Sequence, residues 1–153
     1  MTRASGARTI ERSIDIAASP AWLFDLTQDY SRRLDWDPFL SKAELHGKEA
    51  GVGVRAWCVS KLPPMGMETE YVTFHRPDVV AIKMTKGPLI LRMFAGSWRF
   101  DARDRGTRVT FRYRFETRPS LLAPLAERAF ARDMEKRLEG LRAYARKHAP
   151  PMT

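Results

Sequence analysis

A single long amphipathic segment near the C-terminus limits the folds open to this chain. Pro119 precedes the segment and Pro150-Pro151 follow it, and proline cannot continue a helix. Between Leu121 and about Arg146 the apolar residues recur at helical spacing: Leu122, Leu125, Ala126, Ala129, Phe130, Met134, Leu138, Leu141 and Ala145. At 1.5 Å per residue such a helix is about 40 Å long. It therefore needs an apolar surface of similar length to cover.

The preceding residues are typical of a sheet of short antiparallel strands. Runs of strand-forming residues, separated by turn residues at hairpin-length gaps, occupy 40–46, 52–61, 67–76, 79–86, 89–102 and 107–118. In the last two runs the large apolar residues share one face: Phe94, Trp98, Phe100, Val109, Phe111, Tyr113 and Phe115. One face of this antiparallel sheet is therefore expected to be buried.

The N-terminal part adds one strand and two short helices. Ile10, Ile14 and Ile16 alternate with polar residues, which predicts a half-buried strand over 9–17. Ser19-Pro20 is a helix start, because serine can cap and proline suits the first helical position. A helix over 21–26 and a helical turn over 29–34 follow, ending before Pro38. The predicted class is α+β.

Size and composition indicate one cytoplasmic domain. A chain of 153 residues suffices for one core, and we expect residues 8–147 to form it, with flexible termini at 1–7 and 148–153. Cys58 is the only cysteine, so no internal disulfide is expected. The first residues lack the apolar core of a secretory signal, and no apolar run approaches the roughly 20 residues that span a bilayer.

The net charge of +9 is spread over the chain rather than concentrated. Arginines recur between 103 and 118, while the basic residues of 128–147 are interleaved with Glu127, Asp133, Glu135 and Glu139, as on a solvated helix face. We therefore expect no nucleic acid partner. An anionic membrane surface is the alternative partner that this charge suggests, and the protein is expected to be a monomer or homodimer.

Several short motifs carry a family resemblance by their order and spacing. They are Ile14-Asp15-Ile16-Ala17-Ala18-Ser19-Pro20, Trp22-Leu23-Phe24-Asp25-Leu26, Asp29-Tyr30, Trp36-Asp37-Pro38-Phe39, Arg76-Pro77 and Gly106-Thr107-Arg108-Val109-Thr110. Over about Arg8 to Lys147 the chain resembles the START-like, Bet v 1-like superfamily (SRPBCC), specifically its polyketide cyclase/dehydrase and lipid-transport group. The resemblance implies a helix-grip fold. In this fold a curved seven-stranded antiparallel sheet wraps around a long C-terminal helix, and an apolar cavity lies between the sheet and the helix.

The implied cavity has candidate lining residues on the inner strand phases and the helix. They are Trp57, Val72, Phe74, Ile82, Met84, Phe94, Trp98, Phe111, Tyr113, Phe130 and Met134. Bulky aromatic and adaptable methionine side chains suit a variable apolar ligand. Alternatively, each of them fills a packed core.

Polar residues on the same phases are candidates for chemistry. Glu70 shares a phase with Val72 and Phe74, and Arg92 with Phe94 and Trp98. Glu70 and Arg92 could satisfy each other or orient a ligand oxygen, a desolvated Glu70 could act as acid or base, and Tyr113 could donate to an enolate oxygen. Alternatively, Glu70 and Arg92 lie exposed at strand ends or on a bulge.

Two functions are compatible with these residues. The first is a carrier of a small hydrophobic molecule, such as a lipid, quinone or aromatic polyketide. The second is a cofactor-free polyketide cyclase, aromatase or dehydratase that uses Glu70, Arg92 and Tyr113. The loop 62–67, with two prolines and a glycine, is either a gate or an ordinary turn. No cofactor is expected, and the three histidines lack metal-ligand spacing.

Overall fold

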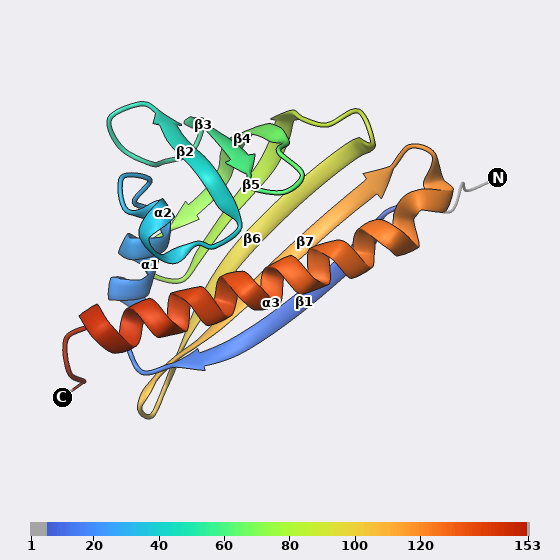
Figure 1. The fold of residues 1–153 in the computed structure, drawn as a ribbon. Coiled ribbons are helices and arrows are strands. Elements are labelled where there is room, and N and C mark those ends of the chain that lie inside the picture. Colours follow the sequence, from blue (N-terminus) through green and yellow to red (C-terminus); the bar gives the residue numbers. More distant parts are fainter. Residues whose placement is uncertain (1–5, 153) are drawn as a thin grey trace.

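In the computed structural model, which describes residues 6–152, one antiparallel sheet curves around one long helix (Figure 1). The strands are β1 (Arg8–Ile16), β2 (Leu40–His46), β3 (Arg55–Ser60), β4 (Gly66–His75), β5 (Val79–Lys86), β6 (Leu91–Arg103) and β7 (Gly106–Thr117). The helices are α1 (Pro20–Gln28), α2 (Arg33–Trp36) and α3 (Ala123–His148), with a 3-10 turn η1 (Ser120–Leu122) before α3. The sheet order is β1-β7-β6-β5-β4-β3-β2. The predicted helix-grip fold is confirmed.

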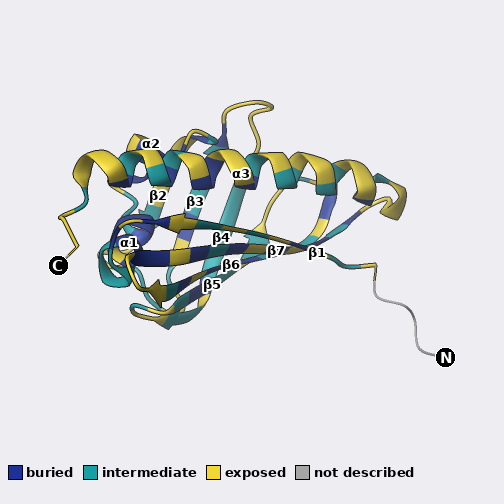
Figure 2. Ribbon diagram, turned by 90° about the horizontal axis from the view of Figure 1, so that it is seen from below, coloured by how far each residue is buried: buried dark blue, intermediate teal, exposed yellow. Residues whose placement is uncertain are grey.

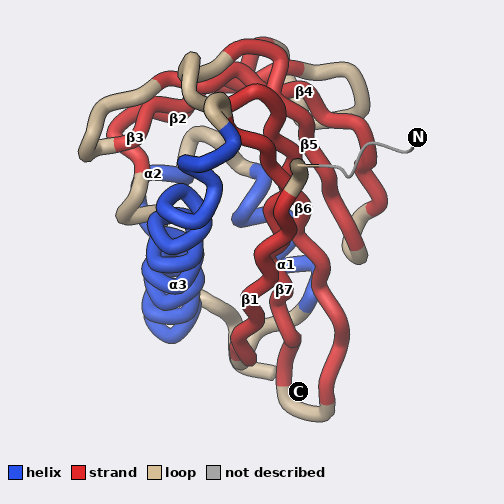
Figure 3. The backbone as a smooth tube through the Cα atoms, turned by 90° about the vertical axis from the view of Figure 1, so that its right-hand side faces the viewer, coloured by secondary structure: helices blue, strands red, loops and turns tan. Residues whose placement is uncertain are grey.

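Helix α3 lies over the concave face of the sheet, along β1 and β7 (Figures 1 and 3). Its sheet-facing side is buried and its opposite side is exposed, as Figure 2 shows. Met134, Leu138 and Leu141 are buried on the inner side, which is the stripe that the helical spacing predicts. None of the helices within residues 6–152 has the length and hydropathy needed to cross a bilayer.

The two longest strands supply the centre of the core. In the β6–β7 register, Trp98 pairs with Phe111 and Phe94 pairs with Phe115. All four side chains are buried. The period-two alternation of the sequence therefore identified the buried face of this hairpin correctly.

The short helices α1 and α2 connect β1 to β2 and close one end of the sheet. The Ser19 hydroxyl accepts a hydrogen bond from the Trp22 amide at 3.2 Å, and Pro20 occupies the first helical turn, as predicted. The second helix begins later than expected. The Asp29 carboxylate accepts hydrogen bonds from the amide and the hydroxyl of Ser31, and this local turn competes with helix formation over the intervening residues.

Strand and terminal boundaries differ in places from the prediction. β3 begins at Arg55 because residues 51–54 form a turn, in which Gly53 has a φ of 88° and the Val54 amide donates to the Gly51 carbonyl. At the C-terminus, His148 is still the last residue of α3. The expected flexibility of the termini falls in part on residues 1–5 and 153, which lie outside the described residues.

Gly140 tests how tightly α3 is seated on the rest of the fold. A Cβ at this position would lie 2.4 Å from the Trp36 carbonyl oxygen and 2.8 Å from Pro38 Cδ. Helix propensity favours alanine by about 1 kcal/mol, but an overlap with backbone costs about 1–3 kcal/mol. We therefore expect Gly140→Ala to lower the free energy of unfolding in urea, whereas Lys136→Ala on the exposed side changes it by less than about 0.5 kcal/mol. A stabilised Gly140→Ala would show that α3 is seated loosely here.

Candidate functional site

Most of the predicted lining residues pack against one another. Trp98 and Phe111 stack with ring centroids 3.8 Å apart, and Phe111 contacts Tyr113 edge-on at 4.7 Å. From α3, Phe130 contacts Phe94 at 5.6 Å and Tyr113 at 5.7 Å. Met134 is fully buried beside this cluster. These side chains fill the space between β6, β7 and α3, which is the packed-core alternative.

The other predicted lining residues divide between the two faces of the sheet. Ile82 and Met84 lie on the inner face, half-buried against the core. Trp57 lies on the outer face, because it pairs with Glu44 and Glu68 across the neighbouring strands while Ala56 is buried. Val72 is also on the outer face and is 43% exposed.

Glu70 and Arg92 do not pair with each other, because β-bulges place both on the outer face of the sheet, which is the alternative given for them above. A bulge between Tyr71 and Thr73 turns Phe74 inward and leaves Glu70 outward, where its Oε1 is 3.1 Å from Arg55 Nε.

Another bulge, between Leu91 and Met93, places Arg92 outward, with its Nε 3.9 Å from Glu116 Oε2. Tyr113 is buried on the opposite, inner face. The three predicted catalytic residues are therefore not brought together.

An open cavity of about 610 Å³ lies at a different place, between α1, the α1–α2 connection, β2, the β2–β3 loop and the end of β4. Its apolar surface comes from Phe24, Tyr30, Ala43, Leu45, Ala50 and Phe74. Among the residues on the predicted lining, Phe74 alone contributes to it. Arg76 and Asp25, which also line the cavity, form a two-pronged ion pair with contacts of 2.7 and 2.8 Å. The volume is within the range of small-molecule sites.

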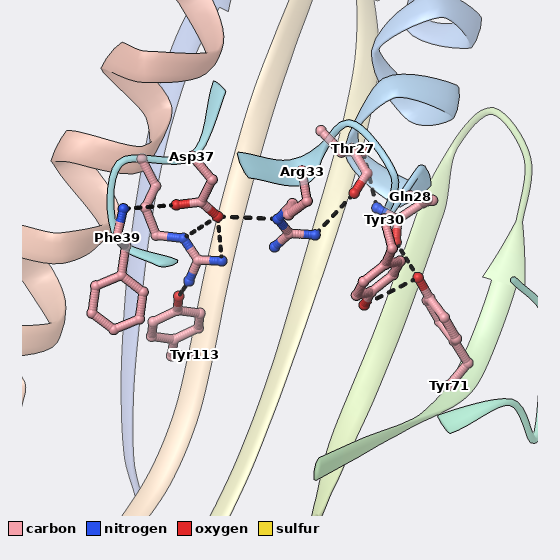
Figure 4. Close-up of polar contacts among 9 residues, drawn as sticks. Thr27, Gln28, Tyr30, Arg33, Asp37, Phe39, Tyr71 and Tyr113 are labelled. Carbon is pink, nitrogen blue, oxygen red and sulfur yellow. Dashed lines mark hydrogen bonds and ion pairs between the residues drawn. The ribbon is translucent and has the colours of Figure 1, made fainter. Parts of the chain in front are cut away.

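The polar lining of the cavity includes the uncharged side chains Gln28 and Tyr30 on α1 and the connection after it. Charged residues also line it, four of them acidic and two basic: Asp25, Asp29, Glu44, Glu49, Lys48 and Arg76. The Tyr71 hydroxyl donates to Gln28 Oε1 at 2.7 Å, and the Gln28 amide donates to Thr27 Oγ1 at 2.9 Å (Figure 4). The Tyr30 and Tyr71 oxygens are 3.5 Å apart. Burial raises the pKa of Tyr30. Tyr30 is therefore a neutral phenol at physiological pH and can donate a hydrogen bond.

Behind this wall lies a buried ionic cluster, which we define as Arg33, Asp37, Arg137 and Tyr113. Asp37 Oδ2 accepts from Arg33 Nε at 3.0 Å and from Arg137 Nη2 at 2.9 Å, and Asp37 Oδ1 accepts from the Phe39 amide at 3.0 Å. Arg137 also donates to the Tyr113 hydroxyl. The Arg33 guanidinium carbon is 5.6 Å from the Tyr30 ring centroid, which connects the cluster to the cavity wall.

The four residues of the cluster hold two guanidinium groups and one carboxylate, so they carry one surplus positive charge. The half-buried Asp133 carboxylate on α3 interacts electrostatically with Arg137 and Tyr113 from outside the cluster. Burial opposes the charge of each group, but the charges of Arg137 and Arg33 outweigh it and hold the pKa of Asp37 below its usual value. Asp37 likewise raises the pKa of both arginines against the effect of burial. Burial raises the pKa of Tyr113 to about 12, so this phenol stays neutral. The net charge of the cluster is +1 across the physiological range.

One further polar atom lies next to this cluster. The Trp36 indole nitrogen is buried and has no hydrogen-bond partner among residues 6–152. Its ring lies 5.0 Å from the Arg33 guanidinium carbon and contacts Trp98 edge-on at 6.0 Å. Within the same residues, no group of three or more His, Cys, Asp or Glu side chains could hold a metal ion.

The sequence contained two signals for this cluster. The first is the motif Trp36-Asp37-Pro38, which belongs to the family resemblance and contains a carboxylate. Arg137 lies three residues after Met134 and four before Leu141, which places a charged residue on the buried helical stripe. A buried arginine requires a partner, so that position alone could have indicated an internal carboxylate.

The comparisons with known proteins agree with this fold. The model of the polyketide cyclase/dehydrase and lipid-transport family matches residues 7–146. The solved Zhui aromatase/cyclase from Streptomyces sp. R1128 is 18% identical, with a TM-score of 0.80 over 92% of this chain and 94% of its own. A START superfamily protein from Mycobacterium smegmatis is 9% identical, with a TM-score of 0.79 over 91% of this chain and 97% of its own.

Norcoclaurine synthase from Thalictrum flavum, solved in complex with dopamine and hydroxybenzaldehyde, is 11% identical, with a TM-score of 0.74 over 94% of this chain and 89% of its own. No curated protein sequence gives a significant match. At these identities the structural likeness establishes the shared fold.

Substitution of Asp37 tests whether the cluster is held by its charge. Asp37→Asn retains the shape of the side chain but leaves two buried guanidinium groups unpaired, so we expect a loss of about 3 kcal/mol in the free energy of unfolding at pH 7. Because the pKa of Asp37 is lowered in the folded protein, this contribution is fully present above about pH 4 and is lost as the pH falls through the lower folded value. Urea denaturation at a series of pH values measures the difference.

Arg137→Met is the matched comparison, because it leaves Asp37 paired with Arg33 and removes the surplus charge. We expect it to cost less than Asp37→Asn, since no unpaired charge remains. Equal costs, or a pH-independent effect of Asp37→Asn, would contradict the ionic account.

Proposed function

The chain belongs to the polyketide cyclase/dehydrase and lipid-transport family, and we propose that it binds a small, largely apolar molecule bearing an anionic or carbonyl oxygen. The binding site is the cavity between α1, β2 and β4. The observation that carries this proposal is an open cavity with apolar surface from Phe24, Leu45 and Phe74, in which Gln28 and Tyr30 lie in front of a buried cluster of net positive charge. Charged side chains, including Asp29, Glu44 and Glu49, also line it.

The chemistry of the wall supports an oxygen-bearing ligand. The Tyr30 phenol is neutral and can donate to a carbonyl or an enolate. An anionic oxygen about 6 Å from the Arg33 guanidinium would gain on the order of 3 kcal/mol from that charge alone at an effective dielectric constant near 20. This gain is opposed by carboxylates in the lining, those of Asp29, Glu44 and Glu49. A carbonyl oxygen that accepts from Tyr30 therefore fits the site as well. The apolar surface of Phe24, Leu45 and Phe74 would contact the rest of the molecule.

Binding without chemical conversion is the form of the proposal that this geometry favours. Catalysis by Glu70, Arg92 and Tyr113 together would require them on one face of the sheet, whereas Glu70 and Arg92 lie on the outer face in ion pairs. Norcoclaurine synthase, a protein of the same fold, was solved with dopamine and hydroxybenzaldehyde bound, which supports a ligand of this kind here.

Filling the cavity tests its role. Ala43 lines the cavity from β2, and Ala43→Trp should occupy the space that a ligand needs. We expect the affinity for two fluorescent probes, anionic 1-anilinonaphthalene-8-sulfonate and neutral N-phenyl-1-naphthylamine, to fall by about tenfold or more. The control is Lys42→Trp, which adds the same ring to the exposed side of the same strand. Unchanged probe binding by Ala43→Trp would refute the site.

The contrast between the two probes tests the positive cluster. The wild-type protein should bind the anionic probe more tightly than the neutral probe, because the unbalanced guanidinium attracts the sulfonate. Tyr30→Phe removes one donor from the wall and should weaken the anionic probe by about twofold to tenfold while leaving the neutral probe unaffected. Equal affinities for both probes in the wild type would contradict the electrostatic part of the proposal.

A further inference from the structure

Exposed apolar side chains gather at one end of the molecule. Leu62 and Leu89 are each 87% exposed, Leu121 is 76% and Leu125 is 68%. They lie on three segments: the β3–β4 loop at 61–65, the β5–β6 loop at 87–90, and residues 118–125, which comprise the β7–α3 connection and the first turn of α3. We call these three segments the apolar end. Met65 and Ile90 are also exposed on them.

The sheet topology brings these connections to the same end. In an antiparallel sheet of order β7-β6-β5-β4-β3, the β3–β4 and β5–β6 loops and the exit of β7 all leave on one side. The Arg118 amide donates to the Ile90 carbonyl at 2.9 Å and joins two of the segments directly. Figure 3 looks onto this end of the molecule.

The leucines are presented by ordered segments. In the β3–β4 loop the Ser60 hydroxyl donates to the Pro63 carbonyl at 2.6 Å, and the Met65 amide donates to Ser60 Oγ at 3.1 Å. The Leu91 amide donates to the Pro88 carbonyl at 3.0 Å, which closes the turn that carries Leu89. Exposure of the leucines therefore follows from the fold. Residues 62–65 form a hydrogen-bonded turn, and residues 66–67 begin β4.

The charged residues of the apolar end itself are all basic. The three segments contain Lys61 and Arg118 and no acidic residue. Exposed Lys86 and Arg92 flank them in the sheet. Three acidic side chains lie close to these segments: Glu127 pairs with Arg8 at 3.1 Å, Glu116 lies 3.9 Å from Arg92, and Glu68 lies opposite Lys86 and 3.5 Å from Arg55. Within residues 6–152, Lys61 and Arg118 form no ion pair with an acidic side chain. Apolar tips with an excess of positive charge match the composition of an anionic lipid surface.

We propose that the apolar end docks on anionic membranes, with its leucines entering the headgroup region and its basic residues contacting lipid phosphates. The exposed leucines lie on three separate segments rather than in a groove. A bilayer can accommodate such separated apolar side chains, because its headgroup region requires no matching shape. The proposal goes beyond the cavity, which is lined by residues of the β2–β3 loop and the end of β4, at the opposite ends of those strands. Docking therefore leaves the cavity accessible.

Vesicle co-sedimentation with the full chain tests the docking. The wild type should sediment with vesicles of phosphatidylcholine and phosphatidylglycerol in equal parts, and more weakly with phosphatidylcholine alone. Leu89→Glu and Leu121→Glu should each reduce the bound fraction by about tenfold. Lys61→Ser should weaken binding to the anionic vesicles alone.

Val52→Glu is the matched control, because Val52 is 68% exposed in the β2–β3 loop at the other end. It should leave vesicle binding unchanged. All four variants alter exposed side chains and should keep the wild-type unfolding midpoint and probe affinity, which separates this proposal from the cavity proposal. The membrane-docking proposal would be refuted if the wild type failed to bind anionic vesicles, or if Val52→Glu lost as much binding as the leucine variants. The apolar end would then be a candidate contact surface for another protein.

Discussion

The Asp37 carboxylate joins three parts of the fold. It receives hydrogen bonds from Arg33 on α2 and from Arg137 on α3, and Arg137 connects it to Tyr113 on β7. A buried carboxylate is stable only when such partners surround it. Its geometry therefore fixes how the short helices meet the long one. Because α2 directly follows the segment that carries Gln28 and Tyr30, the same interaction also positions the wall of the cavity.

The distribution of empty space follows from the side chains of the two central strands. Rings from β6, β7 and α3 contact one another in succession, so the region under the middle of the long helix is filled by Trp98, Phe111 and Phe130. Free volume occurs where the smaller residues Ala43 and Ala50 face α1. A shared family fold thus fixes the layers of the molecule, while the sizes of individual residues determine where a ligand can enter.

The fold was predictable because its signals are periodic and long. The spacing of Leu138 and Leu141, the alternation of Phe111 and Tyr113, and the Ser19-Pro20 start each depend on local chemistry that the fold preserves. The site was less predictable, because it depends on bulges and on long-range pairing. Assigning side chains to the two faces of a strand by a period of two residues fails across the bulges at Val72 and Arg92. The contact between Asp37 and Arg137 spans a hundred residues. The helical spacing indicates that Arg137 needs a buried acidic partner, but it does not identify Asp37 as that partner.

Intermolecular NOEs between the protein and bound 1-anilinonaphthalene-8-sulfonate test the central claim most directly, because they identify the side chains in contact with a ligand. The account predicts NOEs from the probe to Phe24, Tyr30, Leu45 and Phe74. NOEs to Phe111, Phe130 and Met134 instead would mean that the aromatic core opens to admit the ligand beneath α3. The cavity between α1, β2 and β4 would then not be the binding site.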